Sequence, residues 1–351
     1  MKQTITFLFL SLFILSVSGS ILKAQEIYRH PSISPDGSHI TYSLQGDIWV
    51  ADLEENDTRR ITIHEGYEMG PIFNETGDHI AFSSDRYGNN DIFTVPVAGG
   101  EVNRITWRSS GDQLSDWRNG SLIFITERDF NAVEWDAEVH MVDEEGGTPY
   151  RVTDAFADFA SLSPNGEWMA FVRGSCRIAR EAYRGSANLD IWLKNMETGE
   201  FVQLTTFDGN DYMPRWQDDD TLYYISAQSG RYNVHMVDIT ESGTAASSEQ
   251  VTNERDFGIR HFDVSDGGDL IYTSGGRLVH HGADGTAQVL ELNHTGDYRF
   301  DPVVAMSKSD DLTEFAVTPN AKYSALGIHG EVFVTENDEE KSKTRNLSQH
   351  S

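Results

Sequence analysis

Short apolar segments alternate with polar, glycine-containing turns along most of the chain. Residues 70–106 show this pattern clearly, because β-branched and aromatic residues fill four short segments and no window has helical periodicity. The expected strands are Pro71–Phe73, His79–Ser83, Asp91–Val97 and Glu101–Thr106. Glycine-containing turn signals separate these segments. The stretch therefore predicts four successive antiparallel β-strands.

The same four-strand unit recurs along the chain. The copies are His30–Thr62, Gly70–Thr106, Gln113–Thr153, Phe159–Thr205, Met213–Thr252, Ile259–Leu292 and Phe315–Leu347. The threonines that close the first five copies are 44, 47, 52 and 47 residues apart. A repeat of this length built from four strands predicts the blades of a β-propeller. We therefore expect an all-β chain with a six-bladed β-propeller of four-stranded antiparallel blades over residues 25–292.

The seventh copy, residues 315–351, follows a polar connector, residues 293–314. Because the other copies follow one another more closely, we expect the seventh copy to lie outside the ring. A single seven-bladed ring is the alternative. After an expected export signal at residues 1–24, only Gln25 and Glu26 precede Ile27–Tyr28, which runs straight into the first copy. We therefore expect the first blade to close the ring by packing against the sixth without a shared strand.

Three motifs of the first copy carry a family resemblance. Ser34–Gly37, Asp47–Trp49 and Arg60–Thr62 resemble the WD-like repeats of TolB and tricorn-type propellers. Arg180–Trp192 resembles the long loop in the fourth blade of the tricorn-protease-like family. The resemblance covers nearly all of the chain after its first 25 residues. It implies a six-bladed ring at the amino-terminal end of a larger peptidase.

The end of the chain carries a second part of this resemblance. Gly330–Val334 followed by Thr344–Ser348 resembles the first blade of that family's second propeller. The family arrangement is a six-bladed propeller, a seven-bladed propeller, a PDZ module and a serine-peptidase core of the tail-specific type. Nothing here matches the PDZ or peptidase parts, so the resemblance assigns no catalytic residue. We expect residues 315–351 to be the incomplete start of a second propeller in a chain truncated before these modules.

The amino-terminal residues 1–24 have the features of an export signal. Lys2 supplies a positive charge, Ile5–Val17 an apolar core and Ser18–Ala24 a small-residue exit, with cleavage after Ser20 or Ala24. The apolar run is too short to cross a bilayer. We therefore expect an exported protein, located in a bacterial periplasm.

The acidic composition argues against nucleic acid and anionic lipid as binding partners. The chain has 56 acidic and 27 basic residues, which gives a formal charge of −29. Such a surface repels nucleic acid and anionic lipid, so we expect neither as a partner. The single Cys176 cannot form an internal disulfide and is expected to be a small loop residue.

The first strand of each propeller blade lines the central channel. Residues at or just before the first strands are therefore the candidates for binding a peptide there: Arg29, His30, Glu68, Asp158, Asp211, Tyr212, Arg215, Arg260 and His261. The alternative is that these acids and bases pair with one another across the blades.

Two blades carry long insertions between their second and third strands, at Glu127–Ala137 and Arg173–Leu189. The second insertion is cationic and contains Arg173, Arg177, Arg180 and Arg184. It could dock another domain or subunit or hold a peptide carboxylate. Alternatively, it neutralises acids of its own surface.

No motif predicts catalysis. The sequence lacks a nucleophile elbow, a zinc-protease helix motif, a phosphate-binding loop and paired cysteines. His280 and His281 are adjacent on an expected strand, so their side chains point to opposite faces. We expect no catalytic residue, no cofactor and no metal in this chain.

Two functions are compatible with these observations. The first is the non-catalytic propeller region of a tricorn-like serine peptidase, which gates or recruits peptides through its channel and whose full-length form could be a homo-oligomer. The second is a free-standing TolB-like periplasmic propeller that binds a protein partner.

Overall fold

The computed structural model describes residues 26–129, 137–245, 248–294, 312–328, 331–338 and 342–348. The chain divides into two compact units, residues 1–294 and 295–351. The described residues form strands and turns, and they include no helix long and apolar enough to cross a membrane. The expected export signal, most of the insertion at Glu127–Ala137 and most of the connector lie outside the described residues.

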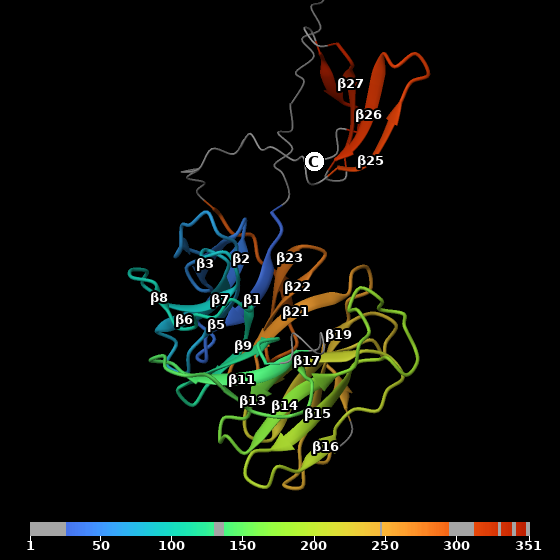
Figure 1. Ribbon diagram of the computed structural model, residues 1–351. Coiled ribbons are helices and arrows are strands. Elements are labelled where there is room, and N and C mark those ends of the chain that lie inside the picture. Colours follow the sequence, from blue (N-terminus) through green and yellow to red (C-terminus); the bar gives the residue numbers. More distant parts are fainter. Residues whose placement is uncertain are drawn as a thin grey trace, which may run out of the picture. The chain divides into compact units, whose positions relative to one another are not determined.

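The first unit contains six sheets, each built from four consecutive antiparallel strands (Figure 1). The first two sheets are β1 (Arg29–Ile33), β2 (His39–Leu44), β3 (Asp47–Asp52) and β4 (Thr58–Arg60), then β5 (Glu68–Phe73), β6 (His79–Ser84), β7 (Asp91–Pro96) and β8 (Asn103–Arg104). The next two are β9 (Asp112–Arg118), β10 (Ser121–Thr126), β11 (Glu138–Asp143) and β12 (Tyr150–Arg151), then β13 (Asp158–Leu162), β14 (Trp168–Arg173), β15 (Asp190–Asn195) and β16 (Phe201–Gln203). The last two are β17 (Asp211–Trp216), β18 (Thr221–Ser226), β19 (Asn233–Asp238) and β20 (Glu249–Gln250), then β21 (Ile259–Val264), β22 (Leu270–Ser274), β23 (Arg277–His281) and β24 (Ala287–Val289). The expected all-β, four-stranded blades are confirmed.

The turn between β1 and β2 explains the Ser-Pro-Asp-Gly motif. Asp36 Oδ1 accepts hydrogen bonds from Ser34 Oγ at 2.6 Å and from the Ser38 amide at 3.0 Å. These bonds, the Ser34 bond foremost, lower the pKa of Asp36 to about 2. Gly37 adopts a φ of +75°, a left-handed conformation that favours glycine. The motif is therefore a hairpin turn that its own side chains hold closed.

The aspartate of the third strand and the closing threonine form one lock within a blade. In the second blade, Asp91 pairs with Arg104 at 2.6 Å, and the Ile92 amide donates to Thr106 Oγ1 at 3.0 Å. The Ile48, Ile191 and Val234 amides donate in the same way to the hydroxyls of Thr62, Thr205 and Thr252. The recurrence of aspartate and threonine in the sequence therefore reflects the attachment of the outer strand to the third strand.

Thr205→Val is expected to lower the free energy of unfolding by about 1–3 kcal/mol, because it leaves the buried Ile191 amide without its acceptor. Chemical denaturation of the purified chain measures this loss. Thr206→Val is the matched control, since Thr206 is exposed and adjacent. Equal midpoints for the two variants would contradict a role of the threonine hydroxyl in the lock.

Neighbouring blades bury apolar side chains between their sheets. Trp49 and Phe93 of the third strands are 6% and 1% exposed, and each belongs to a cluster that joins two blades. Trp192 is partly buried against the cluster between the third and fourth blades. These aromatic side chains therefore contribute to the packing between blades.

The first strands contact one another in a closed cycle from β1 through β5, β9, β13, β17 and β21 back to β1. The first and sixth sheets each contain only their own four strands. A buried cluster joins Tyr42 and Trp49 to Ile271 and Leu278, and the Tyr28 amide donates to the Gly276 carbonyl at 3.2 Å. Closure by packing without a shared strand is therefore confirmed for the described residues, and a seventh blade has no place in this ring.

The second unit contains one four-stranded sheet. Its strands are β25 (Leu312–Val317), β26 (Tyr323–Ile328), β27 (Glu331–Glu336) and β28 (Thr344–Asn346). Phe315, Val317 and Val332 are 71%, 49% and 45% exposed. These exposed apolar side chains are what a single blade without neighbours leaves uncovered, because it cannot bury both of its faces.

Candidate functional site

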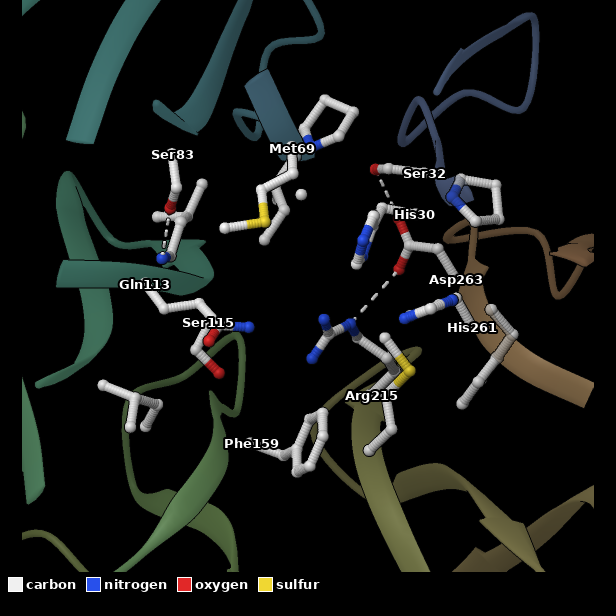
Figure 2. A pocket seen from close by; sticks show the side chains of 18 of the residues that line it. His30, Ser32, Met69, Ser83, Gln113, Ser115, Phe159, Arg215, His261 and Asp263 are labelled. Carbon is white, nitrogen blue, oxygen red and sulfur yellow. Dashed lines mark hydrogen bonds and ion pairs between the residues drawn. The ribbon is translucent and has the colours of Figure 1, made fainter. Parts of the chain in front are cut away.

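A cavity of about 270 Å³ lies at the centre of the ring (Figure 2). Every first strand contributes to its wall, through His30, Met69, Gln113, Phe159, Arg215 and His261 in chain order. Because these strands come from all six blades, the cavity is the central channel of the propeller. Its volume is close to the lower end of small-molecule pockets, about 300–1,000 Å³, so it suits a short segment rather than a folded partner.

Left-handed backbone positions shape this wall. His30, Gly70, Phe159 and Met213 have φ values of 48°, 63°, 48° and 57°, and each lies where the register of its first strand shifts. Such bulges redirect side chains, and a left-handed conformation is strained for a residue other than glycine. All four residues line the cavity. The bulges therefore turn the equivalent position of the first, second, fourth and fifth blades toward the channel.

One carboxylate ties three blades together at the cavity. Asp263 Oδ2 accepts from Ser32 Oγ at 2.6 Å and from the Ile33 amide at 3.1 Å, while Asp263 Oδ1 lies 3.7 Å from Arg215 Nε. Burial raises the pKa of Asp263, and Arg215 opposes this rise. The arrangement joins the sixth blade to the first and to the fifth.

Two histidines face each other beside this ion pair. The rings of His30 and His261 are 4.1 Å apart. Burial lowers the pKa of His30 to about 4 and that of His261 well below its usual value, so both rings are neutral at pH 7. Burial also raises the pKa of Asp158. Arg215, whose Nε faces Asp263, therefore presents a cationic donor next to two neutral imidazole rings, and these groups suit a carboxylate or a peptide carbonyl.

Four of the nine predicted channel residues line the cavity: His30, Asp158, Arg215 and His261. Arg29 and Arg260 are exposed and are not among the lining residues. The Arg260 guanidinium instead donates to the Ile178 carbonyl at 3.1 Å.

The prediction was wrong for Glu68, Asp211 and Tyr212, whose exposed fractions are all 0%. Glu68 forms a buried ion pair with Arg86, and the Tyr212 hydroxyl donates to the Ile259 carbonyl at 3.3 Å. These residues precede the bulge or the cavity-facing segment of their strand, so their side chains enter the blade packing rather than the channel.

The cationic insertion of the fourth blade lies against the fifth blade. Glu181 accepts from the Tyr232 amide at 2.5 Å and pairs with Arg231 at 3.0 Å. Arg184 donates to the Ala227 carbonyl at 3.2 Å. The insertion also supplies Ile178 to the cavity wall. It is therefore continuous with the channel wall.

The four predicted docking arginines are exposed: Arg173, Arg177, Arg180 and Arg184. Three of them stack on aromatic rings, with the guanidinium carbon 5.2 Å from the Trp192 ring centre for Arg173, 4.5 Å from Tyr183 for Arg180 and 4.7 Å from Phe207 for Arg184. Stacking leaves the edges of the Arg173 and Arg180 guanidinium groups available for hydrogen bonds, whereas Arg184 already donates to the Tyr183 and Ala227 carbonyls.

Sequence reasoning did not identify Phe159, Met213, Asp263 and Ile178 as part of the wall. A signal for the bulges was present, because a proline follows the left-handed residue in His30-Pro31, Gly70-Pro71 and Met213-Pro214. Proline within a sheet is confined to edges and bulges. Its recurrence at one place in the repeat marks the inner edge of the blade.

Comparison with known proteins supports this description. Residues 25–286 match the family model of the tricorn protease N-terminal beta propeller domain. A tricorn protease homolog from Saccharolobus solfataricus is 23% identical over 316 residues, which cover 88% of this chain and 28% of the relative. The crystal structure of the tricorn protease superposes with a TM-score of 0.72 at 19% identity over 91% of this chain and 31% of that chain. A protein described as TolB from Agrobacterium tumefaciens superposes with a TM-score of 0.52 at 18% identity over 64% of this chain and 80% of that chain.

The chain matches only a part of the full-length tricorn proteins, but nearly all of its own ring is covered by the domain family. The chain spans less than a third of the length of the tricorn proteins that it matches. The family model, in contrast, covers most of this chain and ends within its sixth blade. The chain therefore belongs to the family of tricorn protease N-terminal β-propeller domains.

Proposed function

We propose that this chain is the non-catalytic propeller region of a tricorn-like serine peptidase and that it gates or recruits peptides through its central channel. The observation that carries the proposal is the cavity itself, which has Arg215 and the His30–His261 pair in its wall. A peptide offers carbonyl oxygens and a terminal carboxylate, which these groups can bind. The exposed arginines of the fourth-blade insertion would guide acidic peptides or dock a further domain.

The proposal includes the location and the partners. Residues 1–24 would direct export to the periplasm, and PDZ and peptidase modules would act on the peptides that pass. The chemistry of peptide hydrolysis would belong to those modules, because the channel residues described here suit binding.

Arg215→Gln is expected to weaken the binding of a fluorescently labelled peptide by about 10- to 100-fold, because a charge-assisted hydrogen bond contributes about 1.5–3 kcal/mol. Fluorescence anisotropy with a panel of short peptides, each with a free or an amidated carboxyl terminus, measures the change. Arg59→Gln is the control, since Arg59 is exposed on the outer strand β4. Equal affinities for both variants and both peptide forms would contradict carboxylate binding in the channel.

A free-standing TolB-like propeller that binds a protein partner is the second candidate. The superposition with the TolB structure supports the fold that this function would need. Reading the genomic DNA past codon 351 distinguishes the candidates. An open frame that encodes PDZ and peptidase modules supports the peptidase, and a stop codon favours the free-standing propeller.

A further inference from the structure

Three side chains of the third blade that do not line the cavity converge beside its second and third strands. Glu138 and His140 are alternate residues of β11 and therefore share one face of the sheet. Asp129 follows β10 and brings its carboxylate to within 3.5 Å of His140 Nε2. One ligand atom from each of the three residues lies within 4.8 Å of the other two. Two of the side chains, Glu138 and His140, are only 1% and 2% exposed.

The fifth blade contains the same structure without the acids. Its strand β19 reads Asn233-Val234-His235-Met236 where β11 reads Glu138-Val139-His140-Met141. In both blades the histidine ring lies 5.8 Å from an aromatic ring, Phe124 in the third blade and Tyr224 in the fifth. A buried histidine is therefore an ordinary part of this strand. The third blade differs because a carboxylate replaces the amide and Asp129 is added.

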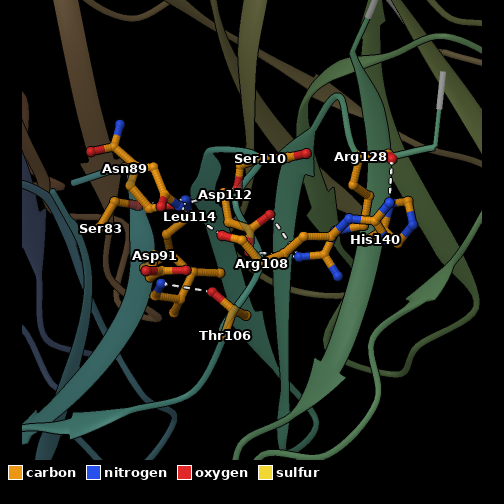
Figure 3. A network of polar contacts seen from close by, with 12 residues as sticks. Ser83, Asn89, Asp91, Thr106, Arg108, Ser110, Asp112, Leu114, Arg128 and His140 are labelled. Carbon is orange, nitrogen blue, oxygen red and sulfur yellow. Dashed lines mark hydrogen bonds and ion pairs between the residues drawn. The ribbon is translucent and has the colours of Figure 1, made fainter. Parts of the chain in front are cut away.

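The surrounding charges favour a cation. The Arg128 Nη2 group donates hydrogen bonds to both carboxylate oxygens of Asp112, at 2.7 and 2.6 Å (Figure 3). Arg151 lies 2.7 Å from Asp154 and 3.9 Å from Glu138. Four carboxylates, those of Asp112, Asp129, Glu138 and Asp154, therefore face two guanidinium groups. Asp112 and Asp154 each pair closely with one arginine, which leaves the carboxylates of Asp129 and Glu138 to favour a cation.

A second observation concerns the histidine itself. Within the described part of the chain, His140 Nδ1 is buried without a hydrogen-bond partner. Buried polar atoms are normally satisfied, and a bound ion is one reason for an exception. The matched His235 also has an unpartnered ring nitrogen, Nε2, so the added acids are what distinguish the third blade. Either ring nitrogen of a neutral histidine can bind a metal.

We propose that Asp129, Glu138 and His140 bind a zinc ion. One imidazole and two carboxylates are ligands that Zn²⁺ accepts, and three protein ligands leave a fourth position for water or another group. The ion would fasten the residues directly after β10, at the start of the long insertion, to the start of β11. No metal was expected from the sequence, because most of the insertion separates Asp129 from the other two ligands.

The test uses the purified chain without a polyhistidine tag. Isothermal titration with Zn²⁺ is expected to show one site, and Co²⁺ is expected to give the visible absorption of a four- or five-coordinate ion. Asp129→Asn and His140→Gln are each expected to weaken Zn²⁺ binding at least about 10-fold, because even the loss of a residue that only orients a metal ligand costs about that much. His235→Gln, the matched change in the fifth blade, is expected to leave binding unchanged.

Circular dichroism establishes that each variant is folded. Asp129 is 41% exposed, so its substitution is a test that does not depend on the tolerance of the core. Absence of a stoichiometric site would overturn the proposal. Equal losses in the His140 and His235 variants, or full binding by the Asp129 variant, would overturn it as well.

Discussion

Tyr42→Ala is expected to lower the free energy of unfolding by about 3–5 kcal/mol, the range for removing a large aromatic side chain from a core. Tyr42 is 0% exposed in the cluster that joins the first and sixth blades. Its ring contacts Tyr28 edge-on at 5.3 Å, and its hydroxyl forms a 2.7 Å hydrogen bond with His294 Nε2. The substitution therefore removes both apolar packing and a polar contact from the place where the ring closes.

Guanidinium denaturation followed by tryptophan fluorescence and by circular dichroism measures the effect. Because the first and sixth sheets share no strand, we also expect the two probes to separate in Tyr42→Ala, as the first blade loosens before the rest. Tyr150→Ala is the control, since Tyr150 is 57% exposed on the outer strand β12. A loss as small as that of the control would contradict closure through the Tyr42 cluster.

The sequence was sufficient to predict the blades because each blade is specified locally. The turn motif at Ser34–Gly37 and the lock between Asp91 and Thr106 act within a few dozen residues. The number of copies of these motifs gives the number of sheets. The apolar third strands indicate that both faces of each blade are covered. Closure without a shared strand was predicted because only Gln25 and Glu26 lie between the expected export signal and Ile27–Tyr28, which leads into the first copy.

The channel was predicted less well because a bulge changes which residues face inward. The period-two alternation of a strand places side chains correctly only while the register is continuous. At Met213 the register of β17 shifts, so Arg215 lines the cavity while Asp211 and Tyr212 are buried. A single residue added to one strand therefore decides which polar groups enter the channel.

The proposed metal site could not be predicted from the spacing of residues in the sequence, because its ligands are separated by most of an insertion. Asp129 lies near the start of the insertion at Glu127–Ala137 and Glu138 directly follows it, and only the pairing of β10 with β11 brings the two residues together. The comparison of β11 with β19 shows what the sequence did contain. A glutamate stands in one repeat where an asparagine stands in the other, although the neighbouring residues are the same.

The buried acid Asp211 leads to the second large prediction, which concerns pH. Asp211 is 0% exposed, and burial, more than any other cause, raises its pKa from 3.8 to about 7. Nearby Asp190 raises this pKa further, while Arg184 and the hydroxyls of Ser226 and Thr205 oppose the rise. The folded chain therefore holds a proton on Asp211 under conditions in which the unfolded chain has released it.

The sign of the effect follows from proton binding. Below about pH 4 the Asp211 carboxyl is protonated in both states, so it contributes no pH dependence there. Between about pH 4 and pH 7 only the folded state binds this proton, so the contribution of Asp211 to stability falls as the pH rises. Asp211→Asn does not titrate and removes this loss. At pH 8 the variant is expected to be more stable than the parent chain, by on the order of 2–4 kcal/mol.

Urea denaturation at several pH values from 5 to 8 measures the difference between the two chains. The difference in the free energy of unfolding is expected to grow toward pH 7 and to level off above it. Asp36→Asn is the control, because the pKa of Asp36 is lowered to about 2 and its charge is constant over this range. If Asp211→Asn and the parent chain have the same pH dependence, Asp211 is ionised in the folded ring, and its interior must solvate the charge.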